Sequence, residues 1–291
     1  MALTATLLAL SAIAMWSFLA FFGAQLSHLP PFLVVGIALC VSGLAGTPWI
    51  KTWKVPAITL LVGITGIFGY HFLYFMAFQY APPVEASLIN YLWPLLIVLL
   101  SPVFLSGYSL KPQHLIGALC GLAGTILILT GGRLTPDVLH LPGYIMAAGA
   151  ALTWACYSLM TKRLPRFPSG AVGGFCLVSG LLSLSSFWLL RGLDGSSITG
   201  LALQDWILLV LLGLGPMGAA FYVWDAALKR GDPRVIGSMA YLTPLTSTLI
   251  LVFFAGRTLT WVSGAAMMLI VGGAVIGSID LLLPTLPPSS A

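Results

Sequence analysis

Charged residues are scarce in this sequence. Asp, Glu, Lys and Arg make up 7% of its 291 residues, whereas hydrophobic residues make up 59%. Soluble globular domains carry about 25% charged residues, so the composition excludes an ordinary soluble domain and predicts a chain whose main solvent is lipid. The 19 prolines and 32 glycines fit that class, because membrane helices tolerate both residues where neighbouring helices satisfy the exposed backbone groups.

Cysteine is also scarce, and the sequence patterns of several functional classes are missing. The four cysteines lie in apolar stretches without a CxxC or Cys/His spacing, so we expect neither disulfides nor a metal site. HExxH, GxSxG and Walker motifs and paired carboxylates are absent, which argues against an enzyme. We therefore expect no catalytic residue and no cofactor. The basic residues behind the net charge of +5 are scattered over short loops, so no nucleic-acid partner is expected.

Long apolar segments divide the chain into ten predicted membrane-spanning helices. A helix needs about 20 apolar residues to cross the hydrocarbon core. The expected ranges are 3–24, 32–48, 55–78, 84–106, 114–131, 141–161, 169–190, 204–228, 234–255 and 259–283. The first segment has no Lys or Arg before it, so we predict a spanning helix there and not a cleaved signal peptide. The second is short for a spanning helix.

The loops predict the orientation in the membrane, because Lys and Arg accumulate in cytoplasmic loops. Nine of the twelve Lys and Arg residues fall in the loops that follow the even-numbered predicted helices. These nine residues are Lys51, Lys54, Lys111, Lys162, Arg163, Arg166, Lys229, Arg230 and Arg234. Both chain termini are therefore predicted to be cytoplasmic.

Two halves of the sequence resemble each other. A VSGL segment at Val41 recurs at Val178, and the stretch PPVEASLINYLWPL from Pro82 aligns with DPRVIGSMAYLTPL from Asp232. We predict a duplication into residues 1–132 and 133–291, each with five helices, which together form one domain. Because five is odd, the second copy enters the membrane from the opposite face, so the repeats are inverted. Inverted repeats place a substrate site near the bilayer midplane, between the halves.

Two prolines occupy matching positions near the centre of the fourth and ninth predicted helices. Pro94 and Pro244 each lack an amide N–H, which frees the carbonyl four residues back, on Asn90 and Ala240. A freed carbonyl at membrane depth needs a partner. These positions therefore predict either a cavity wall with acceptors for an ammonium group or a kink that only shapes helix packing.

Aromatic and weakly polar side chains surround these prolines and make up the candidate substrate site. Such side chains can hold a planar ring while amide and hydroxyl groups fix the polar end of a ligand. The alternative is an ordinary packing stripe, which is the expectation for Phe75 and Phe78. Trp16 and its repeat partner Trp154 are expected either to close opposite sides of a cavity or to pack as structural residues. The candidates are His71, Tyr74, Asn90, Tyr91, Trp93, Trp154, Tyr157, Ser238, Tyr241 and Thr243.

Few acidic residues fall within the predicted helices. Glu85 lies in a first helical turn, where the helix dipole favours an acid. Asp225 precedes Lys229 by four residues, a spacing that lets the two side chains pair. We expect a structural role for both acids.

The ten-helix pattern, the inverted repeat and the proline-centred fourth and ninth helices resemble the drug/metabolite transporter superfamily, in its ten-helix EamA-like branch. Within that branch, the run GYHFLYFMAFQYAPPVEASLINYLWPLLIVLLSP at Gly69 is similar to the exporters of aromatic amino acids. The resemblance implies export of Phe, Tyr, Trp and related compounds across a bacterial inner membrane, through a central cavity. It also implies a cavity role for His71, Tyr74, Tyr91 and Trp93.

The resemblance also bears on the driving force. Four-helix relatives in the superfamily use an acidic residue of their first helix for proton exchange, and the first predicted helix here has no Asp or Glu. A carrier driven by its substrate gradient is therefore expected. The alternatives are an exporter of another planar metabolite or neutral drug, and a membrane-embedded enzyme or scaffold without transport activity.

Overall fold

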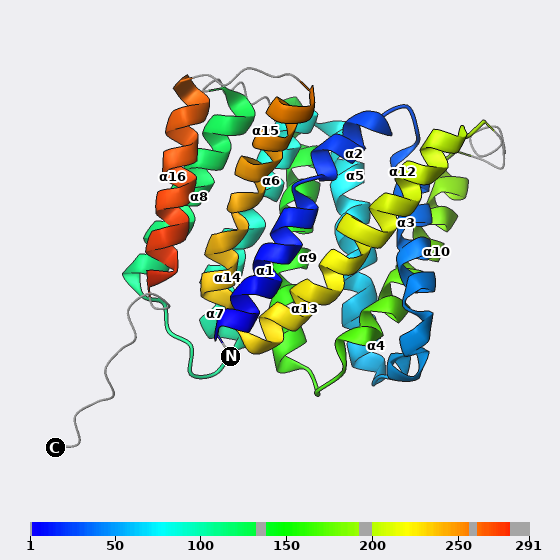
Figure 1. The fold of residues 1–291 in the computed structure, drawn as a ribbon, viewed down its shortest axis with the longest axis horizontal. Coiled ribbons are helices and arrows are strands. Elements are labelled where there is room, and N and C mark those ends of the chain that lie inside the picture. Colours follow the sequence, from blue (N-terminus) through cyan, green and yellow to red (C-terminus); the bar gives the residue numbers. More distant parts are fainter. Residues whose placement is uncertain (1, 132–137, 192–199, 256–260, 280–291) are drawn as a thin grey trace.

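The computed structural model describes residues 2–131, 138–191, 200–255 and 261–279, and every regular element in these ranges is helical (Figure 1). The boundary expected at 132/133 and both ends of the helix expected at 259–283 lie outside the described residues. The elements of the first half are α1 (Ala2–Trp16), α2 (Leu19–Gln25), α3 (Pro31–Ala45), η1 (Thr47–Trp53), α4 (Ala57–Ile64), η2 (Thr65–Gly69), α5 (Tyr70–Tyr80), α6 (Pro83–Asn90), α7 (Leu92–Phe104) and α8 (Pro112–Thr130). Those of the second half are η3 (Val138–His140), α9 (Leu141–Arg163), η4 (Ser169–Ala171), α10 (Val172–Arg191), α12 (Leu203–Leu214), η5 (Gly215–Ala219), α13 (Ala220–Arg230), α14 (Pro233–Ala240), α15 (Leu242–Ala255) and α16 (Trp261–Gly277).

The helices define an all-helical membrane protein. Within the described residues, seven helical segments are long and apolar enough to cross a membrane. An eighth is obtained if α3 and η1, which meet at an angle of 85°, are counted as one span. At 15 residues, α3 is about 22 Å long, which agrees with the short second helix expected from the sequence.

Corresponding elements of the two halves begin and end at corresponding residues. The elements η2, α5 and α6 recur as η5, α13 and α14 at positions 150 residues further along the chain. Two of these elements, η2 and η5, are single π-helical turns inside long helices. Such an extra residue in a helix interrupts the regular hydrogen-bond pattern and is frequent at functional sites. The duplication inferred from sequence therefore extends to irregular features of the backbone.

The helices that contain the paired prolines are both broken. The chain between α6 and α7 turns at Tyr91 (φ −65°, ψ 4°), and that between α14 and α15 turns at Tyr241 (φ −66°, ψ −11°). Each break lies three residues before a proline, because the proline ring and its missing N–H prevent a regular helical turn there. The Tyr91 carbonyl accepts a hydrogen bond from the Tyr241 hydroxyl at 3.2 Å, so the two breaks meet between the halves.

Glycines allow the closest helix contacts. The helices α8 and α16 lie side by side (Figure 1), and a methyl group built on Gly117 would lie 2.6 Å from the Gly273 carbonyl oxygen and from Gly277. Such spacing admits no side chain on either helix. Gly117, Gly273 and Gly277 thus fix the packing of α8 and α16 at one edge of the molecule.

Candidate functional site

A cavity of about 570 Å³ lies between the two halves. Its wall includes residues of α1, α2, α3, α5, α6 and α7 from the first half and of α9, α12, η5, α13 and α15 from the second. Its rim on α2 includes the exposed residues Leu19 and Gly23. Figure 1 shows α2 and the N-terminus at opposite ends of the molecule, so the cavity lies toward the end away from the N-terminus.

Most of the candidate residues line this cavity. The structure brings together His71, Tyr74, Asn90, Tyr91, Trp93, Trp154 and Thr243, together with Pro244. Four candidates are not part of the wall: Tyr157, Ser238, Tyr241 and Pro94 lie behind it, in the packing between helices. Phe75 and Phe78, expected only to pack, do line the cavity. The two break points are therefore not equivalent, since only the second proline reaches the cavity.

Four tryptophans form the floor of the cavity. The Trp16 ring centroid lies 6.1 Å from that of Trp93, 5.8 Å from that of Trp154 and 5.0 Å from that of Trp224. Trp16, Trp93 and Trp154 line the cavity, and Trp224 lies beneath them with 1% of its surface exposed. Trp16 and Trp154 therefore meet at one floor and do not close opposite sides. Edge-to-face contacts of this kind stabilise an aromatic cluster by about 0.5–1.5 kcal/mol per pair beyond area burial.

The π-helical turns hold two cavity residues in place. The Trp16 indole donates a hydrogen bond to the Pro216 carbonyl in η5 at 3.1 Å, and His71 Nδ1 lies 2.7 Å from the Ile67 carbonyl in η2. A carbonyl can only accept, so Nδ1 carries the proton, and in the neutral ring the other nitrogen is an acceptor. Each irregular turn thus supplies a backbone acceptor that orients a ring of the wall.

Two residues of the cavity wall each carry a fully buried polar atom that has no protein partner within the described residues. These atoms are Asn90 Oδ1 and Thr243 Oγ1, one from each half. The Asn90 amide nitrogen donates to the Tyr70 hydroxyl at 3.1 Å, which fixes the amide so that its oxygen remains the free acceptor. An unsatisfied buried polar atom costs about 1–3 kcal/mol, so both positions favour a polar ligand group that can bond to them.

The remaining polar groups of the wall are neutral. The Tyr74 hydroxyl lies 3.0 Å from the Ser87 hydroxyl, while the Tyr91 hydroxyl makes no hydrogen bond within the described part of the chain. No Asp, Glu, Lys or Arg lies among the described residues that line the cavity. The site therefore suits a ligand with a large apolar part and a compact polar group, and not a ligand with a net charge that would need a counter-ion.

Sequence reasoning missed several cavity residues. Phe221 lies 5.5 Å from Trp154 and 6.1 Å from His71 between ring centroids, and Ser87, Ser247 and Thr248 add hydroxyl groups to the wall. Signals for two of them exist in the sequence: Phe221 occupies the position of His71 in the second half, and Thr248 follows Pro244 by one helical turn. Phe22 on α2 carries no such signal, because it lies outside the matched segments.

Below the tryptophan floor, charged side chains bond to neighbouring elements at the end of the molecule near the N-terminus, and Arg234 links the two halves there. The predicted pair of Asp225 and Lys229 is confirmed at 2.7 Å, and Lys229 also donates to the Phe167 carbonyl at 2.9 Å. Arg234 donates to the Ser109 carbonyl and, from Nη2, to Asp232 at 2.5 Å. Burial raises the pKa of Asp232, but the hydrogen bonds from Arg234 outweigh it, so the pKa lies below its ordinary value.

An all-helical membrane fold with an aromatic cavity between two related halves defines the class of a membrane carrier. The chain belongs to the EamA-like transporter family, whose sequence profile matches residues 3–130 and 141–279. It is therefore a transporter and not an enzyme.

Individual relatives are similar over almost the whole chain. The aromatic amino acid exporter YddG of Ancylobacter novellus is 40% identical over 287 residues, which cover 95% of this chain and 97% of that protein. The Escherichia coli protein of the same name is 24% identical over 290 residues, or 94% of this chain and 96% of that protein. A solved crystal structure with 39% sequence identity matches with a TM-score of 0.89 and covers 96% of this chain and 98% of its own.

Proposed function

We propose that this chain exports aromatic amino acids and related compounds by alternating access through the central cavity. The observation that carries the proposal is the cavity wall itself, which combines aromatic rings with Asn90 and Thr243, two residues whose Oδ1 and Oγ1 atoms have no partner within the described part of the chain. The names of the relatives point to the same substrates. The cavity volume of about 570 Å³ lies within the range of about 300–1,000 Å³ that is usual for small-molecule sites.

In this proposal the substrate ring lies against the tryptophan floor. Trp93 and Trp154 offer ring edges and faces at the floor, and Phe75 and Phe78 cover the ring from α5. Offset and edge-to-face contacts hold aromatic rings of different size with similar strength. Such a floor accepts Phe, Tyr and Trp but gains little from a small aliphatic side chain.

The amino acid head group lies between the two break regions. Its ammonium group donates to Asn90 Oδ1 and to the acceptor nitrogen of His71, while the hydroxyls of Tyr91 and Thr243 donate to its carboxylate. These four groups come from both halves of the chain. A zwitterionic head group with no net charge suits a wall whose described residues carry no charged side chain.

The proposed architecture has ten membrane-spanning helices in two inverted five-helix repeats, residues 1–132 and 133–291. The matched bounds of α5 with α13 and of α6 with α14 support it. The nine basic residues that follow the second, fourth, sixth and eighth of the ten predicted spans also support it. Both termini face the cytoplasm of a bacterial cell with the chain in its inner membrane. The cavity then faces outward, and the contact of Arg234 with Ser109 closes the cytoplasmic end.

The experiment that tests this function is uptake of labelled phenylalanine, tryptophan and alanine into proteoliposomes, with empty liposomes as the control. We expect flux of the two aromatic amino acids and little flux of alanine. Flux that persists without a pH gradient would support a carrier driven by its substrate gradient, and strict proton dependence would refute it. If no amino acid is carried, or if alanine is carried equally well, the proposed substrate class is wrong.

A further inference from the structure

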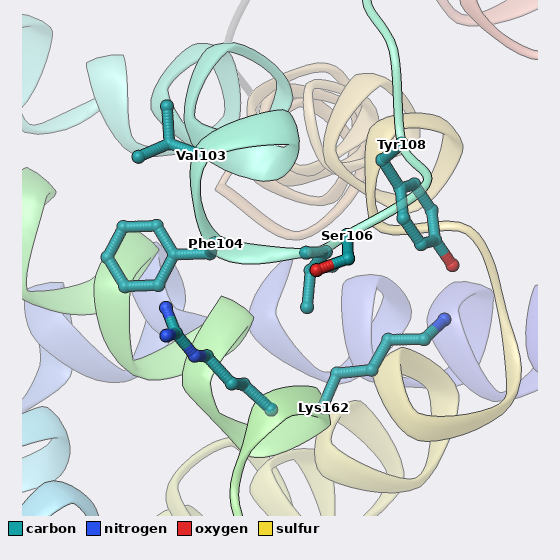
Figure 2. A pocket seen from close by; sticks show the side chains of 7 residues that line it. Val103, Phe104, Ser106, Tyr108 and Lys162 are labelled. Atoms are coloured by element: carbon teal, nitrogen blue, oxygen red, sulfur yellow. The ribbon is translucent and has the colours of Figure 1, made fainter.

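A second hollow, of about 370 Å³, lies outside the central cavity at the ends of α7 and α9 (Figure 2). It is lined by Val103, Phe104, Leu105, Ser106, Tyr108, Lys162 and Arg163. Figure 2 shows Phe104, Ser106 and Lys162 around the same hollow, with Tyr108 beside the Lys162 side chain. None of these residues lines the central cavity.

The hollow is basic. Lys162 donates one hydrogen bond, to the Gly231 carbonyl at 2.5 Å, and its ammonium group has two further N–H donors. Arg163 is exposed and makes no hydrogen bond or ion pair within the described part of the chain. Of the described residues that line the hollow, none is acidic. The nearby acid Asp232 is already bonded to Arg234. The excess positive charge therefore favours an anion.

Uncharged donors complete the lining. Ser106 is exposed and lies two residues after the end of α7, and no hydrogen bond to its hydroxyl is found among the described residues. Cations in the last turn of α9 also stabilise that helix end, but this effect does not require a hydroxyl group or a hollow beside them. A tetrahedral oxyanion accepts hydrogen bonds from guanidinium, ammonium and hydroxyl donors at the same time.

One side of the hollow is apolar and is exposed on the surface of the molecule. Val103, on the last turn of α7, is 71% exposed, and it belongs to a segment apolar enough to cross the membrane. A free anion in water would gain nothing from this contact, whereas a lipid has an acyl chain that can lie against Val103 and Phe104. Basic pockets at the cytoplasmic ends of membrane helices bind anionic lipid head groups in this way.

We propose that this hollow binds the phosphate group of an acidic phospholipid, with Arg163, Lys162 and Ser106 as its ligands. The site joins the ends of α7 and α9, which belong to different halves of the chain. The lipid would therefore stabilise the contact between the halves at this end of the molecule. The proposal does not depend on which compound the central cavity carries.

The test measures lipid binding to the purified, full-length protein by native mass spectrometry. Phosphatidylglycerol and phosphatidylcholine with identical acyl chains are titrated separately, and inorganic phosphate is added as a third arm. We expect phosphatidylglycerol to bind more tightly than phosphatidylcholine. Arg163→Gln should weaken phosphatidylglycerol binding about fivefold, the effect of one basic residue near an anionic lipid surface. Arg166→Gln removes an exposed charge outside the hollow. This variant should bind phosphatidylglycerol as tightly as the original protein does.

Each outcome decides the proposal. If inorganic phosphate displaces phosphatidylglycerol when both are at the same concentration, the phosphate site is upheld, but its ligand is free phosphate and not a lipid. Equal binding of the two lipids, or unchanged phosphatidylglycerol binding by Arg163→Gln, would overturn the site. The exposed Arg163 side chain is suited to this test, because its replacement breaks no described contact, and unchanged thermal unfolding would verify that the variant is folded.

Discussion

At the scale of single residues, the polar atoms of the cavity are more informative than its rings. Many aromatic side chains pack in any membrane protein, but a buried polar atom without a partner costs free energy unless a ligand bonds to it. Among the described residues, Asn90 Oδ1 and Thr243 Oγ1 are such atoms. Both lie close to the two helix breaks. The sequence predicted hydrogen-bond acceptors in the same regions, but on the backbone carbonyls of Asn90 and Ala240.

Replacing Asn90 with Ala should therefore weaken binding of the amino acid head group. A hydrogen bond to a charged group contributes about 1.5–3 kcal/mol, so we expect KM for phenylalanine to rise at least about tenfold. Kinetics of phenylalanine uptake into proteoliposomes would measure this effect. Ser185→Ala is the control, because the exposed Ser185 hydroxyl only bonds to Leu181 of its own helix.

Replacing Trp93 with Ala should impair tryptophan transport more than Trp93→Phe does. The alanine variant removes the ring that contacts Trp16 and Trp224, whereas phenylalanine keeps an aromatic surface at the floor. We expect about a tenfold loss of tryptophan uptake for the alanine variant, the size of one lost aromatic contact with its buried area. Size-exclusion chromatography would verify that both variants are folded. Equal uptake by the alanine variant and the original protein would remove Trp93 from the site.

At the scale of elements, the sequence predicted regular features better than irregular ones. The breaks near Pro94 and Pro244 were predictable, because proline acts through its own covalent structure. The π-helical turns η2 and η5 were not, since an extra residue in a helix depends on the packing around it and leaves no distinctive composition. The floor contact of Trp16 with Trp154 likewise depends on how the halves dock, and so does the position of Tyr157, Ser238 and Tyr241 behind the wall.

Two adjacent glycines of α16 offer a matched test of helix packing. A methyl group on Gly273 would lie 2.6 Å from the Gly117 carbonyl oxygen, whereas one on Gly272 would meet nothing within 4 Å. We expect Gly273→Ala to destabilise the protein by about 1–3 kcal/mol. Gly272→Ala should stabilise it by about 0.5–1 kcal/mol, because alanine favours the helix. Thermal unfolding in detergent would compare them, and the same melting temperature for both would contradict the packing described for α8 and α16.

At the scale of the whole molecule, the cavity and the closed end define one state of a two-state carrier. Exposure of the cavity at one end requires that the other end stay closed, and Arg234 bridges Asp232 and Ser109 there. The ion pair is therefore expected to stabilise the conformation seen here.

The pH dependence of stability should report on this ion pair. The native pKa of Asp232 is lowered by Arg234, so its contribution is fully present above the ordinary carboxyl pKa of about 4 and is lost as the pH falls through the native value. Asp232→Asn keeps an acceptor for the backbone N–H of Arg234 but loses the charge. Its melting temperature should lie below that of the original protein at pH 7, and the difference should shrink below pH 4. A constant difference at all pH values would show that the charge is not responsible.

Several contacts between the halves join residues that occupy equivalent positions in the two copies. Trp16 meets Trp154, His71 meets Phe221, and the Tyr241 hydroxyl bonds to the Tyr91 backbone. In an assembly of two identical five-helix chains, a residue on the axis can only face itself. A single continuous chain is free of that restriction, so each copy can change without the other. The imidazole opposite a phenyl ring is one result of that independence: a duplicated protein can give one ligand two chemically different walls.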